Sequence, residues 1–170
     1  MNANSTMCLS TGWMMAPYGN EGVTTGAVAS GLRPAVRMDN AGSRLVLIVE
    51  DDPPTADVLA TAIGDERGYT ALRVGTADEA LAALGALAPD LVLLDIRLPG
   101  MSGLELYDRI KGDPRYRSLP VMFETGGHHV QELRERGIAT YVRKPFDVDQ
   151  VVGFVKRLVP PPNGRARPIN

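Results

Sequence analysis

The chain has 170 residues, 44% of them hydrophobic, and its 18 basic and 20 acidic side chains leave a formal charge of −2. Such a composition is typical of one globular domain with tails. A charge so near zero excludes a broad basic surface for nucleic acid or acidic membranes. No stretch approaches the ~20 apolar residues of a membrane helix, and the first residues have no signal-peptide pattern. We therefore expect a cytoplasmic protein with no nucleic-acid or membrane partner, whose function depends on a local site.

The two ends of the chain differ in composition from the middle. Residues 1–43 are rich in Gly, Ser, Thr, Asn and Ala, and residues 160–170 are rich in proline. Segments of this kind bury too little apolar surface to offset their ordering entropy, so we expect a disordered leader and a disordered tail. Two interpretations of residues 1–37 stay open. They are a disordered leader that begins at Met1, or the natural protein begins at Met38 and does not include them.

Between these ends, five apolar runs alternate with five helical patterns. The apolar runs predict strands at 45–49, 70–74, 90–95, 119–125 and 139–144. The helical patterns begin at Pro54, at a capping box of Thr76 and Glu79, at 103–111, at 129–137, and after an N-cap at Asp147. This alternation predicts a doubly wound α/β fold, in which a five-stranded parallel sheet carries helices on both faces.

Polar side chains stand where these strands end. Glu50, Asp51 and Asp52 follow the first run, Asp95 ends the third, Thr125 the fourth and Lys144 the fifth. Parallel strands bring their carboxyl ends to one edge of the sheet, so these side chains should meet there. Clustered carboxylates favour a hard cation such as Mg²⁺, and an added ammonium and hydroxyl make a site for a phosphoryl group. An aspartate there can be the nucleophile that forms an acyl phosphate.

Four motifs at these strand ends carry a family resemblance. In chain order, "VEDD", "DIRLPGMSGLEL", "PVMFETGG" and "YVRKPF" resemble the receiver domain of two-component response regulators over residues 44–159. The resemblance implies a flavodoxin-like sheet with strand order 2-1-3-4-5. It also implies a single-domain response regulator that accepts a phosphoryl group and signals by protein contact or by phosphorelay.

The resemblance assigns roles residue by residue. Asp95 is the phosphoacceptor, and Glu50, Asp51, Asp95 and the backbone carbonyl of Arg97 are the expected Mg²⁺ ligands. Thr125 is the switch hydroxyl, Lys144 the phosphoryl-binding lysine before a cis Pro145, and Tyr141 the aromatic switch residue. The implied phosphodonor is a sensor histidine kinase or a histidine phosphotransfer protein, and an unidentified protein receives the signal. The chain is then no enzyme beyond promoting its own phosphorylation and dephosphorylation.

Other interpretations of the same residues stay open. Asp51 or Asp52 could cap the first helix, Thr125 could begin a turn, and Tyr141 could be an ordinary strand aromatic. The chain could be an adaptor that does not use phosphate, or a phosphatase of the haloacid-dehalogenase type, although Arg97 stands where that family has an aspartate. The interval between Thr125 and Lys144 is short for a receiver by about one helical turn, which predicts a shortened or frayed fourth helix.

Overall fold

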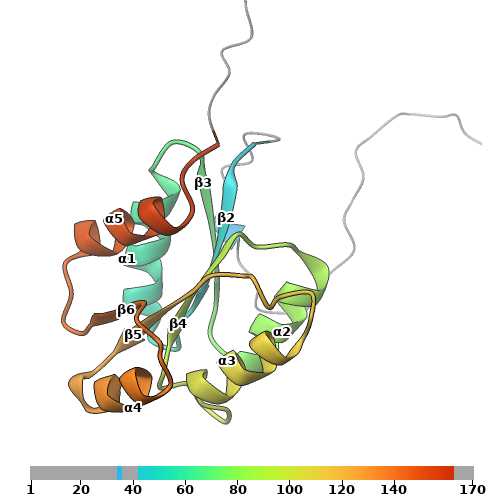
Figure 1. Ribbon diagram of the computed structural model, residues 1–170. Coiled ribbons are helices and arrows are strands. Elements are labelled where there is room, and N and C mark those ends of the chain that lie inside the picture. Colours follow the sequence, from blue (N-terminus) through green and yellow to red (C-terminus); the bar gives the residue numbers. More distant parts are fainter. Residues whose placement is uncertain (1–33, 36–41, 163–170) are drawn as a thin grey trace, which may run out of the picture.

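The computed structural model describes residues 34–35 and 42–162 (Figure 1). The strands are β1 (Pro34–Ala35), β2 (Arg44–Val49), β3 (Tyr69–Val74), β4 (Leu91–Asp95), β5 (Val121–Thr125) and β6 (Tyr141–Arg143). The helices are α1 (Pro53–Gly64), α2 (Ala77–Ala86), α3 (Gly103–Gly112), α4 (Val130–Glu135) and α5 (Val148–Leu158), with a 3-10 turn, η1 (Gly127–His129), before α4. The expected leader and tail lie largely outside the described residues, as do the alternative starts Met1 and Met38, so they stay predictions.

The strands form one sheet in the order β1-β3-β2-β4-β5-β6. The five strands from β2 to β6 are all parallel to their neighbours, which confirms the predicted order 2-1-3-4-5. The two residues of β1 pair antiparallel with β3 at the edge of the sheet, an addition that the sequence did not predict.

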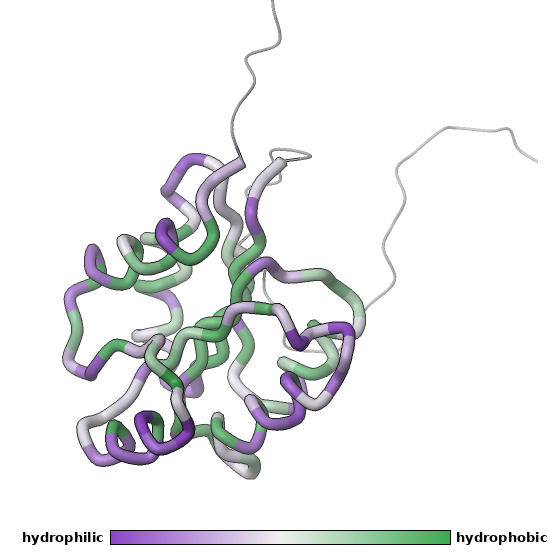
Figure 2. The backbone as a smooth tube through the Cα atoms, viewed as in Figure 1, coloured by the Kyte–Doolittle hydropathy of each residue, from purple (hydrophilic) through white to green (hydrophobic). Residues whose placement is uncertain are grey.

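The parallel strands are apolar on both sides because helices cover both faces of the sheet. One core lies beneath α1 and α5 and includes Ile48, Leu59, Leu93, Met122 and Val151. The other lies beneath α2, α3 and α4 and includes Val49, Leu84, Leu106, Phe123 and Leu133. Figure 2 shows the hydrophobic segments gathered along the strands and on the inner sides of the helices. Within the described residues, no helix is long and apolar enough to cross a membrane.

Side-chain caps fix where four of the helices begin, among them α2, α3 and α5. Thr76 accepts a hydrogen bond from the Glu79 amide, as predicted, although Glu79 itself accepts from the amide of Gly75 rather than closing the capping box. Asp147 caps α5 as predicted. At α3, the side chains and amides of Ser102 and Glu105 form a complete capping box, which was not among the predicted caps. Each cap satisfies amides that have no partner inside the helix.

The fourth helix is short, which confirms the expectation from the interval between Thr125 and Lys144. It has six residues and follows η1, whose first residue is Gly127. Just past its end, the guanidinium of Arg136 donates to both carboxylate oxygens of Asp108 on α3, at 3.1 and 2.9 Å. The short helix is therefore held against α3 by an exposed ion pair as well as by its buried Leu133.

Candidate functional site

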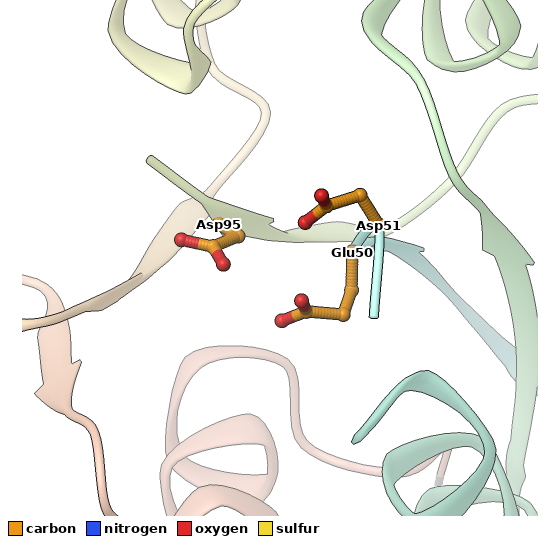
Figure 3. A group of neighbouring side chains, drawn as sticks. All are labelled: Glu50, Asp51 and Asp95. Carbon is orange, nitrogen blue, oxygen red and sulfur yellow. The ribbon is translucent and has the colours of Figure 1, made fainter. Parts of the chain in front are cut away.

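The carboxyl ends of β2 and β4 bring three acidic side chains together. Glu50 and Asp51 follow β2, and Asp95 is the last residue of β4. One carboxylate oxygen of each lies within 4.8 Å of the others, and Figure 3 shows the three side chains directed toward a common space. Glu50 and Asp95 are each 3% exposed, whereas Asp51 is exposed to solvent. The sequence predicted that these residues meet, and the parallel sheet places them together.

Lys144 joins this cluster from the end of β6. Its Nζ donates to Oε2 of Glu50 at 2.5 Å and to Oδ2 of Asp95 at 2.6 Å. Burial alone would lower the pKa of Lys144, but the hydrogen bonds to Asp95 and Glu50 outweigh burial and raise it. Burial raises the pKa of Glu50, although the hydrogen bond from Lys144 opposes the rise. The lysine therefore stays charged and compensates the two buried acids. The peptide bond between Lys144 and Pro145 is cis, as predicted.

The donor set fits a hard divalent cation. Three carboxylates converge, and a single ammonium cannot neutralise them all. Oxygen-only sites with few protein ligands and open positions for water suit Mg²⁺. The backbone amide of Arg97 donates to Oδ1 of Asp95 at 3.0 Å, which holds this carboxylate in place and brings the chain at residue 97 close to the site. The carbonyl of Arg97 stays the predicted fourth protein ligand.

Asp52, the third acid after β2, caps the first helix. Its carboxylate accepts from the amide of Thr55 at 3.0 Å and from the Thr55 hydroxyl at 2.6 Å, and these two bonds lower the pKa of Asp52. Its own amide donates to Oε1 of Glu50 at 3.2 Å. The capping interpretation is therefore confirmed for Asp52 rather than for Asp51, and Asp52 also orients the Glu50 side chain through its backbone.

The two predicted switch residues, Thr125 and Tyr141, make no hydrogen bond to the acids or to Lys144 among the described residues. Thr125 ends β5 and is fully buried, and its hydroxyl donates to the carbonyl of Gly126 at 2.7 Å. Tyr141 begins β6, is half-buried, and packs against the core beneath α2, α3 and α4. The Thr125 hydroxyl is thus bonded to the backbone of the next residue, and the role of Thr125 as a switch stays a prediction, as does that of Tyr141.

Glu124 also belongs to the site, although the sequence pattern did not predict it. It pairs in register with Asp95 on the neighbouring strand, is 0% exposed, and has Oε2 3.7 Å from Nζ of Lys144. Among the described residues, neither of its oxygens accepts a hydrogen bond. Burial raises the pKa of Glu124 to about 8; the charge of Lys144 opposes this rise, while the charges of Glu50 and Asp95 and a side-chain hydrogen bond with Glu50 add to it. The available signal was an acid inside the apolar run "VMFET", all of whose residues are buried.

Comparisons with known proteins agree with this geometry. Residues 46–156 match the family described as response regulator receiver domain. The chain is 31% identical over 115 residues to sporulation initiation phosphotransferase F of Bacillus subtilis, covering 67% of this chain and 93% of that protein. It is 36% identical over 118 residues to the DNA-binding transcriptional regulator NtrC of Salmonella typhimurium, covering 68% of this chain but only 24% of NtrC.

Solved structures show the same likeness. The signal receiver domain of a signal transduction histidine kinase from Syntrophus aciditrophicus superposes with a TM-score of 0.63 at 32% sequence identity. The superposition covers 76% of this chain and 98% of that domain. The match therefore extends over nearly the whole of a separately solved domain.

Proposed function

The chain belongs to the response regulator receiver domain family, and from that premise we propose that Asp95 accepts a phosphoryl group from a phosphohistidine. The donor is a sensor histidine kinase or a histidine phosphotransfer protein. The observation that carries the proposal is the hydrogen bond of 2.6 Å between Lys144 and Asp95, beside the acids Glu50 and Asp51. A nucleophilic carboxylate held next to a fixed ammonium group suits phosphoryl transfer, in which charge develops on the phosphoryl oxygens.

The transfer needs one bond to form and one to break. An oxygen of Asp95 attacks phosphorus, the bond from phosphorus to the histidine nitrogen breaks, and that nitrogen keeps the electron pair. Lys144 then donates to a phosphoryl oxygen instead of to Asp95, while the Arg97 amide continues to hold the other carboxylate oxygen. Mg²⁺ held by Glu50, Asp51, Asp95 and the Arg97 carbonyl would supply the positive charge that the phosphoryl oxygens require.

An apolar hollow beside Lys144 suits the docking of the phosphodonor. It has a volume of about 370 Å³ and is lined by Pro54, Thr55, Val58, Leu59 and residues 144–146. Val58 in α1 is 52% exposed, which is high for a large hydrophobic side chain. A partner that packs on this hollow lies directly next to Lys144, so a histidine that it carries is brought to the edge where Asp95 stands.

The signal then leaves by protein contact or by onward transfer of the phosphoryl group. Phosphotransferase F, which this chain covers along 93% of its length, bears a name that supports a relay. When Asp95 is phosphorylated, Thr125 releases the Gly126 carbonyl and donates to the phosphoryl group, and Tyr141 moves with Thr125. Added charge at Asp95 thus biases a local two-state element.

Intact mass spectrometry tests the proposal. Wild-type protein incubated with Mg²⁺ and acetyl phosphate should gain one phosphoryl group, and Asp95→Asn should gain none. Asp65→Asn is the matched control, because Asp65 is exposed at the end of α1 and should leave the gain unchanged. A wild type that gains no phosphoryl mass, or an Asp95→Asn protein that gains as much as wild type, would contradict the proposal.

The shortened α4 favours one alternative, an adaptor that binds partners without phosphate. The same experiment separates the two functions. An adaptor would show no phosphoryl mass and would bind its partners equally well as wild type and as Asp95→Asn.

A further inference from the structure

Glu124 is a buried acid that phosphoryl transfer does not require. Its side chain is 0% exposed, and within residues 42–162 neither carboxylate oxygen accepts a hydrogen bond. A buried polar group without a partner destabilises the fold. As an acceptor, Glu124 gains a partner only if a neighbouring donor moves toward it.

Three groups of the site share one side of the sheet with Glu124. Glu50, Asp95, Glu124 and Lys144 each stand two residues after a residue of the core beneath α1 and α5, namely Ile48, Leu93, Met122 and Val142. Side chains two residues apart on a strand point the same way, and Glu50 and Lys144 are the first residues after β2 and β6. Lys144 comes from β6 and must pass over β5, the strand of Glu124, to reach Asp95 on β4.

The ammonium of Lys144 is the donor in question. It has three N–H groups, two of which bond to Glu50 and Asp95 at 2.5 and 2.6 Å. Its distance to Oε2 of Glu124 is 3.7 Å, which exceeds a charged hydrogen bond by only about 1 Å. A small shift of the ammonium would therefore exchange the Glu50 carboxylate for the Glu124 carboxyl group as its acceptor.

We propose that Lys144 passes from Glu50 to Glu124 when Glu50 becomes a metal ligand. This inference rests on the proposed function, because it takes Glu50, Asp51 and Asp95 as the Mg²⁺ ligands. The Glu50 oxygen bonded to Lys144 is not free to ligate, and an ammonium next to a divalent ion is repelled. With Glu124 as its new acceptor, Lys144 stays beside Asp95, in reach of an incoming phosphoryl group. Glu124 is thus a positioning residue that acts through Lys144.

The exchange predicts two effects of opposite sign. Removing the Glu124 carboxylate takes an unsatisfied buried group out of the metal-free protein, which should raise its unfolding temperature. The same change removes the acceptor that receives Lys144, which should weaken Mg²⁺ binding. A residue that only packs the core would lower the unfolding temperature when replaced and would leave the ion affinity alone.

Calorimetric titration with Mg²⁺ and thermal unfolding in a chelator test the exchange on the full chain. Glu124→Met should unfold at a higher temperature than wild type without metal and should bind Mg²⁺ roughly tenfold more weakly. Glu124→Gln should fall between the two, because an amide oxygen still accepts from an ammonium. Glu135→Gln makes the same chemical change at an exposed position of α4 and should match wild type in both measurements.

The exchange would be contradicted if both Glu124 variants bound Mg²⁺ as tightly as wild type. It would also be contradicted if both variants unfolded at a lower temperature than wild type in the chelator. If wild type gains phosphoryl mass at Asp95 in either case, the proposed function stands and only the exchange fails. If wild type neither binds Mg²⁺ nor gains phosphoryl mass, the proposed function fails and the exchange fails with it.

Discussion

At the carboxyl edge of the sheet, the single ammonium group of Lys144 faces three buried carboxyl groups, those of Glu50, Asp95 and Glu124. Two of them share the lysine through short hydrogen bonds, and the third is left without a donor in the described part of the chain. Buried charges are stable only when paired, so the third carboxyl group avoids ionisation instead. The raised pKa of Glu124 is therefore a consequence of how few donors the site contains.

This raised pKa predicts how the stability of the metal-free protein depends on pH. In the unfolded chain Glu124 loses its proton near the ordinary value of 4.5, whereas in the folded chain it keeps the proton up to about 8. Between these values the unfolded state binds fewer protons, so the free energy of unfolding falls as pH rises, by at most ~1.4 kcal/mol per pH unit. Below 4.5 the residue contributes no pH dependence, and above 8 its effect is constant.

Urea unfolding of wild type and Glu124→Gln in a chelator, at intervals from pH 5 to pH 8, measures this effect. The stability advantage of the glutamine variant should grow steadily across that range, since glutamine does not titrate. Comparing the two proteins cancels the titration of all other groups that they share. A difference between them that stays constant with pH would show that Glu124 is already ionised in the folded protein at pH 5.

Among the elements, α3 lies very close to the end of β4 at its first residue, Gly103. The amide of Gly103 donates to the carbonyl of Ile96 at 2.8 Å, which ties the start of α3 to the segment just after Asp95. A Cβ at this position would lie 2.1 Å from the carbonyl oxygen of Asp95 and 2.9 Å from Cα of Ile96. Both contacts are with backbone, so α3 or the end of β4 must shift to admit any side chain.

Gly103→Ala should therefore destabilise the protein by about 2 kcal/mol, despite the higher helix propensity of alanine, and should also weaken Mg²⁺ binding by moving Asp95. Gly112→Ala, at the other end of α3, has no atom within 4 Å of the added methyl group and should be neutral or slightly stabilising. Urea unfolding and Mg²⁺ titration of both variants check this pair. Equal stability of the two alanine proteins would mean that the close approach of α3 to β4 is dispensable.

The elements also show how far the sequence alone predicted the site. The points where apolar runs stop at polar residues predicted the strand ends. Because parallel strands share one carboxyl edge, the strand ends predicted that four residues are neighbours: Glu50, Asp51, Asp95 and Lys144. Glu124 was not found because a linear pattern reveals an acid in a strand but not which face it occupies. That face depends on the pairing of Asp95 with Glu124, which is set by long-range contacts.

Two further details were beyond the reach of the sequence pattern. The short interval after Thr125 predicted a reduced fourth helix, but the division of that segment into η1 and α4 depends on local backbone geometry. The bond from the Thr125 hydroxyl to Gly126 is a choice among side-chain rotamers, and residue spacing carries no information about rotamers.

On the scale of the whole molecule, the two edges of the sheet are built differently. At the amino edge, Arg44 pairs with Asp90 at 2.7 Å, and the Tyr69 hydroxyl donates to the carbonyl of Val159 at 2.8 Å, so the chain after α5 is fastened to the start of β3. At the carboxyl edge the charged groups are partly unmatched. Stabilising contacts therefore lie at the amino edge, and incompletely paired acidic groups lie at the carboxyl edge. The strands that connect the two edges are covered by both cores.

The acids of the site lie on β2 and β4, which are central strands, and this position predicts how Mg²⁺ affects hydrogen exchange. The slowest amides of β2 and β4 exchange by global unfolding, which also destroys the site, so Mg²⁺ at 100 times its Kd should slow them about 100-fold. Amides of η1 and α4 belong to a short segment that we expect to open locally, so their exchange should change little. Hydrogen-exchange mass spectrometry with and without Mg²⁺ measures both sets of amides.

In Asp51→Asn the slowing in β2 and β4 should be largely lost, because an exposed ligand is removed while the buried pairs with Lys144 remain. Equal slowing in α4 and β4 would mean instead that the whole domain opens as one unit, and unchanged exchange in β4 would mean that the acids bind no ion.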